Sequence, residues 1–375
     1  MIITEDINPV TCYGQVIEVN HRYPMDLSLF YIISDIKLTS KKNTKLDISR
    51  YRIQCYINKV RMKITSGRIR IQMFQADDRL IKKARGTDKL KKIAVIHDLS
   101  GMGKCSLTAA IPVISAMGVQ ACPLPTAVLS NQTGYGSYFW DDYTDRMQLI
   151  MDEWKKMGFK PDGVYTGFLA DARQVDVILK FTDMFCTDET HILIDPVMGD
   201  GGNIYRTYSE ELCEKLRILV QHATVITPNL TEALLLLYGE QGMKEKMELF
   251  SQMDETQQLK ETEKSGRELA DRFGLKSIVI TGVDVVCGDG SVKMGNLVIE
   301  ENEADWYFSI KEGGSYSGTG DLFASVLSAG MVKGISMKEC VQKAIAFLAG
   351  AIHDAVLEGT DRNDGVCFEK YLKML

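Results

Sequence analysis

The sequence has few features of a secreted, membrane-bound or metal-binding protein. Its nine cysteines stand singly, without a C-x-x-C pair. Its five histidines are dispersed along the chain, at His21, His97, His191, His222 and His353. No apolar run approaches the roughly 18 residues that cross a bilayer, and the N-terminus lacks the charged-then-apolar pattern of a signal peptide. We therefore expect reduced thiols, no histidine- or cysteine-based metal cluster, no membrane segment and a cytoplasmic location.

Charge is divided unevenly along the chain. The first 92 residues hold 19 basic and 9 acidic residues, which leaves 25 of the 44 basic and 41 of the 50 acidic residues for the remainder. Such an asymmetry usually marks a boundary between parts of a protein. We place the boundary in the polar stretch from Lys82 to Lys89. The chain is thus predicted to have a basic extension over residues 1–90 and one large domain over residues 91–375.

The basic extension resembles no known family. Alternating apolar and polar residues at 51–57 and 68–74 predict short strands in it. Its positive charge is compatible with an acidic or nucleic-acid partner, but the simpler interpretation is an extension that the large domain does not need. A nucleic-acid partner is therefore not expected.

Short β-branched runs alternate with amphipathic segments from Lys92 onward. This alternation predicts an α/β fold with a mostly parallel sheet and helices on both faces. Residues 284–310 are expected to form antiparallel strands, and the polar segment 239–266 a solvated helical excursion. The expected strands are 93–96, 163–166, 192–194, 224–226 and 277–280, and the expected helices are 105–117, 171–185, 209–220, 230–238, 320–333 and 336–355.

The most specific local signal is the glycine-rich turn Ser317-Gly318-Thr319-Gly320-Asp321, which directly precedes an apolar helix. Glycines allow backbone N–H groups to converge on an anion, and the helix N-terminus adds a dipole that favours phosphate. Asp321 would lie in the first helical turn, where its carboxylate can accept the proton of an attacking hydroxyl during phosphoryl transfer. The alternative is that Asp321 only caps the helix.

Two familiar nucleotide-binding motifs are excluded by their own fixed positions. The glycine-rich turn has Phe323 where a dinucleotide fingerprint needs its third glycine, and it follows no first strand. Gly103-Lys104 would fit a P-loop only if Asp98 were glycine and Cys105 were serine or threonine.

Further carboxylates stand near the ends of predicted strands. Asp195 begins Asp195-Pro196-Val197, and Glu232 lies three residues after Asn229. In a doubly wound sheet the carboxyl ends of the strands line the ligand crevice. Mg²⁺ binds through one or two carboxylates together with substrate phosphates, so these residues are candidate Mg²⁺ ligands. The alternative for each is ordinary turn chemistry.

Taken in order, these segments resemble the pyridoxal/pyridoxine (vitamin B6) kinases of the ribokinase-like superfamily. The resemblance covers about residues 92–375 and is carried by 195–200, 227–233, 279–282 and 318–324. It implies a ribokinase-like α/β fold and ATP-dependent phosphorylation of the hydroxymethyl group of pyridoxal, pyridoxamine or pyridoxine. It also implies Mg²⁺ and ATP, a monovalent cation and a homodimer.

The resemblance also implies a role for each residue of the motifs. Asp321 would be the catalytic base, and the turn before it the anion hole. Asp195 and Glu232 would handle Mg²⁺. The remaining residues are Gly318, Thr319 and Gly320 for the anion hole, and Asp200, Asn229 and Thr281 for the nucleotide.

The substrate pocket mixes features of two sister families. The segment Ser130–Tyr135 resembles the Ser-Asn-His-Thr-Gly-Tyr segment of pyridoxal kinases, which places Thr133 against the pyridine ring, although Gln132 replaces the usual histidine. Phe168 stands where tyrosine is frequent; it can stack on a ring but cannot donate a hydrogen bond.

The first turn after the predicted strand 93–96 resembles the Asp-x-Ser-Gly-Gly turn of hydroxymethylpyrimidine kinases, and it makes Asp98 and Ser100 candidate substrate contacts unless they only shape the turn. Hydroxymethylpyrimidine (phosphate) kinase is therefore the second candidate. A sugar kinase is a distant third, because the pocket offers few polar ring contacts. A catalytically silent B6-binding protein is the non-enzyme alternative.

Overall fold

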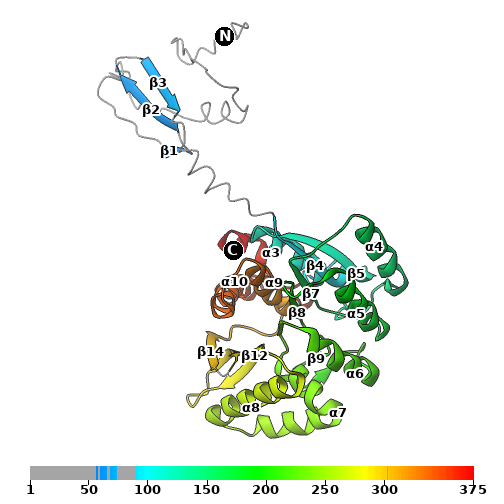
Figure 1. Ribbon diagram of the computed structural model, residues 1–375. Coiled ribbons are helices and arrows are strands. Elements are labelled where there is room, and N and C mark those ends of the chain that lie inside the picture. The colour runs from blue at the N-terminus through cyan, green and yellow to red at the C-terminus, as the bar shows by residue number, and fades with distance from the viewer. Residues whose placement is uncertain (1–55, 58–59, 66–67, 74–89, 302) are drawn as a thin grey trace. The chain divides into compact units, whose positions relative to one another are not determined.

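The computed structural model describes residues 56–57, 60–65, 68–73, 90–301 and 303–375. The chain divides into two compact units, Met1–Asp88 and Lys89–Leu375 (Figure 1). In the first unit, β1 (Tyr56–Ile57), β2 (Val60–Thr65) and β3 (Arg68–Met73) form an antiparallel sheet in that order. The strand expected at 68–74 is present as β3. Most of the strand expected at 51–57 lies outside the described residues.

The second unit is built on a nine-stranded sheet with the order β14-β13-β12-β11-β8-β7-β4-β5-β6. The pairs from β12 through β11, β8, β7 and β4 to β5 are parallel, whereas β6, β13 and β14 pair antiparallel. The strands are β4 (Lys92–Ser100), β5 (Gln120–Leu129), β6 (Trp140–Asp142), β7 (Gly163–Thr166), β8 (His191–Ile194), β11 (Val225–Ile226), β12 (Ser277–Val286), β13 (Val292–Glu300) and β14 (Glu303–Ile310). The predicted mostly parallel sheet is confirmed.

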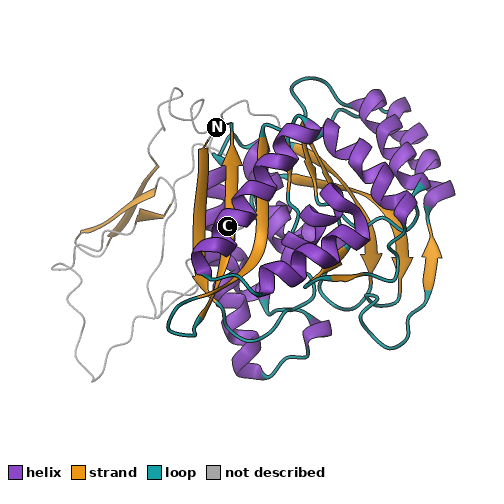
Figure 2. Ribbon diagram, turned by 90° about the horizontal axis from the view of Figure 1, so that it is seen from below, coloured by secondary structure: helices purple, strands orange, loops and turns teal. Residues whose placement is uncertain are grey.

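Helices cover both faces of this sheet, as Figure 2 shows. Alternation along β4 explains how one strand serves two cores, because successive side chains point to opposite faces. Ile93 and Val95 pack with α3, α9 and α10, and Ala94 and Ile96 pack with α4 through α8. The helices are α3 (Ser106–Ala116), α4 (Thr144–Lys156), α5 (Arg173–Phe185), α6 (Glu210–Leu219), α7 (Leu230–Ser251), α8 (Glu255–Phe273), α9 (Thr319–Val332) and α10 (Met337–Glu358).

Several elements differ from the expectation; β6 and α4 are among those that the sequence does not predict. The sequence does not predict β5, whose Pro123 and Pro125 read as strand breakers; the structure tolerates them because β6 pairs only with residues 127–129 of β5, so the prolines lie on an open edge. The helix expected at 230–238 continues to Ser251, past a break at Gly239 with φ 71°. Met243 and Phe250 anchor this continuation in the core, so the segment 239–266 is less solvated than expected.

One helix departs from the expectation that no segment is apolar enough to cross a membrane. α10 has 22 residues and meets the length and hydropathy of a membrane span. Core helices of soluble proteins pass the same test. Cys340, Val341, Ala344 and Phe347 of α10 are buried in the core shared with α9.

The parallel strands place their carboxyl ends along one edge of the sheet. Asp98 and Ser100 lie at the end of β4, Phe168 just after β7, and Asp195 directly after β8. Asn229 follows β11 and forms a parallel bridge with Thr281 of β12. This edge is where ligands bind in open α/β sheets.

Candidate active site

The glycine-rich turn forms the N-terminus of α9. Gly318 is the residue before the helix and has φ 80°, and a Cβ built there would lie 2.1 Å from the backbone oxygen of Lys104. Only glycine combines this left-handed conformation with so close an approach. The first N–H groups of a helix have no partner within the helix, and the predicted anion hole of Thr319 and Gly320 would use these donors.

Asp321 reaches away from its own helix to two other elements. Its Oδ1 lies 2.8 Å from Nε2 of His97 on β4, and its Oδ2 accepts the backbone N–H of Ser106, at the start of α3, over 2.8 Å. The side chain of Asp321 is 13% exposed. These contacts do not fit the interpretation of Asp321 as a simple helix cap. They leave a fixed carboxylate with a small accessible surface in the first turn of α9.

His97 is a residue of this site that the sequence reasoning missed. It was counted only among the dispersed histidines, although its place directly before Asp98 at a strand end is a signal that could have found it. The ring is buried, and its Nδ1 lies 3.0 Å from Oδ1 of Asp98. Burial alone would lower the pKa of His97, but Asp321 and then Asp98 raise it to about 10.

Asp98 and Ser100 continue the same network. Ser100 donates its hydroxyl to Oδ2 of Asp98 over 2.6 Å, and both side chains are buried. Burial would raise the pKa of Asp98, but hydrogen bonding and charge from His97, with a further hydrogen bond from Ser100, lower it overall. Asp98 and Ser100 therefore belong to a chain of contacts that runs from Ser100 through Asp98 and His97 to Asp321. Their predicted contact with the substrate stays a prediction.

Asp195 lies close to Asp321 but outside this network. Its side chain is buried, and burial together with the negative charge of Asp321 raises the pKa of Asp195. A cation bound beside Asp195 would favour the ionised form of this carboxyl.

Asn229 and Glu232 form a capping box at the start of α7. Asn229 Oδ1 accepts the N–H of Glu232 over 3.0 Å, and Glu232 Oε2 accepts the N–H of Asn229 over 2.9 Å. Glu232 Oε1 also accepts the N–H of Met198 over 3.1 Å. Burial and the charge of Asp195 raise the pKa of Glu232. Here the turn chemistry that the sequence left as an alternative is present, and it ties the Asp195 loop to α7.

The nucleotide candidates lie along the same edge. The side-chain amide of Asn229 donates to the backbone oxygen of Gly199 over 2.8 Å, which connects α7 to the short hairpin of β9 (Gly199–Asp200) and β10 (Asn203–Ile204). The backbone N–H of Thr281 donates to Pro228 over 2.9 Å. Asp200 accepts a hydrogen bond of 3.4 Å from Ser315, just before the glycine-rich turn.

The donor set is compatible with a magnesium ion that arrives with a nucleotide. Among the residues that the structure describes, no group of three or more histidine, cysteine, aspartate or glutamate side chains could hold a metal ion by itself. Mg²⁺ needs fewer protein ligands when phosphates supply the others. Asp195, with its buried oxygens, is the residue that fits this need best, and Glu232 lies behind it with both oxygens already accepting backbone N–H groups.

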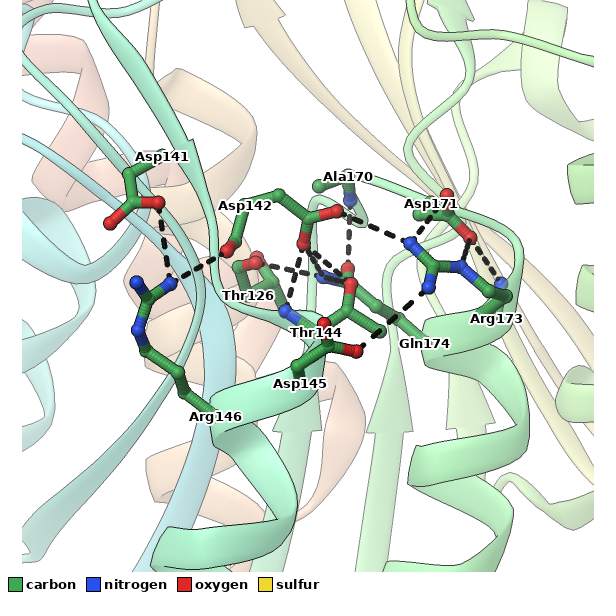
Figure 3. Close-up of polar contacts among 10 residues, drawn as sticks. All are labelled: Thr126, Asp141, Asp142, Thr144, Asp145, Arg146, Ala170, Asp171, Arg173 and Gln174. Atoms are coloured by element: carbon green, nitrogen blue, oxygen red, sulfur yellow. Dashed lines mark hydrogen bonds and ion pairs between the residues drawn. The ribbon is translucent and has the colours of Figure 1, made fainter.

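Phe168 is held by a polar network behind it. Its ring packs edge-to-face on Trp140 of β6 with 5.8 Å between centroids, and its backbone oxygen accepts the hydroxyl of Thr126 over 3.0 Å. Gln174, which is fully buried, donates to the backbone oxygen of Thr126 and to the hydroxyl of Thr144. Figure 3 shows the contacts of Gln174, on α5, with Thr126 of β5 and Thr144 of α4, and with Asp142 of β6 beside them. The network holds the backbone of Phe168, whose ring packs on Trp140.

The C-terminal segment contacts the connection between β5 and β6, which the sequence does not predict. Thr133 lies in the connection between β5 and β6, and its neighbour Gln132 donates to the side chain of Asn363 over 3.0 Å. Tyr135 donates to Asp364. A cavity of about 410 Å³ lies here, between the first turn (Gly101–Lys104) and this segment.

Comparison with known proteins assigns a family to this geometry. A sequence profile described as phosphomethylpyrimidine kinase matches residues 101–364. The chain belongs to this family. The match begins at Gly101, after Asp98 and Ser100, and it spans both acidic strand ends and the glycine-rich turn of α9. It confirms the relation to the ribokinase-like kinases.

Solved structures and a curated relative extend this result. A provisionally named phosphomethylpyrimidine kinase of Bacteroides thetaiotaomicron, solved with pyridoxal, is 37% identical with a TM-score of 0.68, and 76% of this chain and 95% of that one are covered. Pyridoxal kinase of Lactobacillus plantarum is 26% identical with a TM-score of 0.64 and coverage of 76% and 96%. A provisionally named pyridoxal kinase of Schizosaccharomyces pombe is 25% identical over 215 residues, which are 55% of this chain and 57% of that protein.

Proposed function

We propose that the chain transfers the γ-phosphoryl group of ATP to the hydroxymethyl group of a vitamin B6 compound. The observation that carries this proposal is the fixed Asp321 carboxylate at the head of α9, beside backbone donors suited to a phosphoryl group. Support for the substrate comes from the Bacteroides thetaiotaomicron relative, which was solved with pyridoxal. Phe168, which packs edge-to-face on Trp140, offers an aromatic face on which a pyridine ring can stack.

The proposed step uses the protein mainly to orient and to stabilise charge. The substrate hydroxyl gives its proton to Asp321 while its oxygen forms a bond to the γ-phosphorus. The bond between that phosphorus and the bridging oxygen breaks, and ADP leaves with the electron pair. The N–H groups at the start of α9 stabilise the charge on the transferred group. Bound near Asp195, Mg²⁺ would neutralise charge on the phosphates.

Hydroxymethylpyrimidine is the second candidate substrate, and a specific observation favours it. The family profile is that of phosphomethylpyrimidine kinases, and the first turn with Asp98 and Ser100 is of that type. Both substrates are flat heteroaromatic rings that carry a hydroxymethyl group, so the chemistry at Asp321 does not separate them. Discrimination must come from hydrogen bonds at the ring edge.

A single assay separates these candidates. ADP release is measured with pyridoxal, pyridoxamine, pyridoxine and hydroxymethylpyrimidine as acceptors, and kcat/KM is compared side by side. We expect at least one B6 compound to be the better substrate. A higher value for the pyrimidine would replace the assignment, and tight B6 binding without ADP release would identify a silent binding protein. A homodimer, a monovalent-cation requirement and a cytoplasmic location stay predictions.

A further inference from the structure

We propose that His97 is a positioning residue for Asp321: a buried imidazolium that donates one hydrogen bond to Asp98 and one to Asp321, and so holds the base toward the substrate hydroxyl. This role rests on the proposed phosphoryl transfer, because a base is needed only if a hydroxyl loses its proton. The geometry is a chain of three side chains from two distant elements, Asp98 and His97 on β4 and Asp321 on α9.

The ring is fixed in place from several sides. Tyr165 of β7 packs edge-on against it with 5.9 Å between centroids. A Cβ on Gly167 would lie 2.1 Å from Nε2 of His97, so the loop after β7 closes directly over the ring. The side chain of His97 is 1% exposed. A ring so confined transmits its orientation to any group that it binds.

Each ring nitrogen of His97 lies near both a carboxylate and a backbone N–H, so the contacts bear on whether that nitrogen carries a proton. Nε2 lies 2.8 Å from the Asp321 carboxylate, which can only accept, but 3.4 Å from the backbone N–H of Phe168, which can only donate. The shorter contact therefore favours a proton on Nε2. Nδ1 lies 3.0 Å from the Asp98 carboxylate, which can only accept, and 3.0 Å from the Asp98 backbone N–H, which can donate only to an unprotonated Nδ1. Hydrogen bonds between charged groups are about twice as strong as neutral ones, which favours a second proton on Nδ1.

The surroundings of the ring make its charge useful. Three carboxyl groups lie around the ring, where the polyphosphate of the nucleotide would add further negative charge: Asp98 of β4, Asp321 of α9 and Asp195 after β8. The other titratable groups nearby are Tyr165 of β7 and Cys105 before α3. A cation at His97 offsets this concentration of negative charge. Asp321 can then stay beside the transferred phosphoryl group without being repelled from its productive position.

The first experiment reads the ring directly in the full-length wild-type protein. Nitrogen-15 NMR of the imidazole side chains reports which nitrogens carry protons. We expect both His97 nitrogens to stay protonated between pH 6 and 9, and this state to be lost at the upper end of that range in Asp321→Asn. A wild-type ring protonated on Nε2 alone at neutral pH would overturn the proposal, whatever the variants do.

The second experiment separates positioning from folding. His97→Gln keeps a neutral donor at this place, and we expect it to lower kcat roughly 10- to 100-fold while the KM values change less than about threefold. His353→Gln is the matched control, because His353 also contacts a carboxylate, Glu312 at 2.8 Å, but on the surface. It should leave kcat unchanged.

The outcomes distinguish the two proposals. If the wild-type protein phosphorylates no hydroxymethyl acceptor, the proposed function fails. If the wild-type protein is active and folded His97→Gln retains its kcat, the role of His97 fails while the proposed function stands. If His97→Gln does not fold, the NMR measurement on the wild-type protein decides.

Discussion

Two pairs of acids at the same edge of the sheet are treated very differently by the fold. The first acid pair, Asp98 and Asp321, shares the buried imidazole of His97. The second acid pair, Asp195 and Glu232, has no basic side chain within ion-pair distance among the described residues. The pKa of Asp98 is lowered, whereas those of Asp195 and Glu232 are raised. The first pair thus has a cationic partner within the protein, whereas the second pair is the one that we propose to bind a cation.

The strongest test of this contrast removes the base itself. Asp321→Ala should lower kcat by about 10²–10⁴-fold, the usual contribution of general acid–base catalysis, and leave ATP binding largely intact. Steady-state kinetics and calorimetric titration with ATP measure the two effects. Asp354→Ala, which removes a surface partner of Lys370, is the control. A loss of less than about tenfold would show that Asp321 is not the base.

The cation of the first acid pair should also be visible in stability. Because the folded-state pKa of His97 is raised to about 10, its stabilising effect is complete below the unfolded pKa of about 6.5 and is lost as the pH rises toward 10. The free energy of unfolding should fall by up to about 1.4 kcal/mol per pH unit in this window. Denaturant unfolding between pH 6 and 10 measures the slope. A His97→Gln variant that shows the same slope would assign it to another group.

The second acid pair should respond to magnesium and the first should not. Asp195→Asn is expected to raise the Mg²⁺ concentration for half-maximal activity by roughly tenfold, because one of the few carboxylate ligands is lost. Activity at increasing Mg²⁺ measures this shift, and high Mg²⁺ should restore much of the rate. Asp98→Asn is the matched comparison, with reduced activity at every Mg²⁺ concentration. An equal Mg²⁺ shift in both variants would abolish the distinction between the pairs.

A smaller effect, on substrate preference, is expected at Thr133, which belongs to neither acid pair. Thr133→Val should reduce the preference for a B6 compound over hydroxymethylpyrimidine severalfold, because a ring-edge hydrogen-bond partner is removed. The ratio of the two kcat/KM values measures it, and the pyrimidine serves as the internal control. An unchanged ratio would remove Thr133 from the substrate contacts.

The smallest effect should follow removal of residues 1–88. Both acid pairs and all their contacts lie in the unit Lys89–Leu375. The truncated chain is therefore expected to keep its kcat and its thermal unfolding midpoint. Precipitation or loss of activity would show that the extension belongs to the kinase fold and that the predicted boundary near residue 90 is misplaced.

The sequence predicts the elements of the second unit better than their contacts. Hydrophobic periodicity is local, so β7 and the helix α5 that follows it are found within a few residues of their bounds, although α4 is missed. Each short motif is also local, and such motifs mark the turn at Gly318 and the acid at Asp195 as candidate site residues. Neither signal states which polar side chains meet across the sheet edge.

The missed features share this physical cause. His97 has the appearance of a core histidine until α9 is placed beside β4, and Asn363 lies in a segment without periodicity. β5 is hidden because its prolines are acceptable only where one side of the strand is open: Pro123 and Pro125 pair with β4 but lie outside the part of β5 that pairs with β6. Each of these depends on tertiary neighbours that no window of sequence contains.

The bond between His97 and Asp321 joins residues 224 positions apart. During synthesis, most of the second unit must therefore leave the ribosome before the base can meet its partner. Until then the nascent chain holds His97 and Asp98 without α9, and closing so long a loop is entropically costly. Domains generally fold as units, and contacts between distant residues form slowly. A chain released just before residue 321 would carry every strand of the nine-stranded sheet but not the proposed base, so an early stop would yield no partly active enzyme.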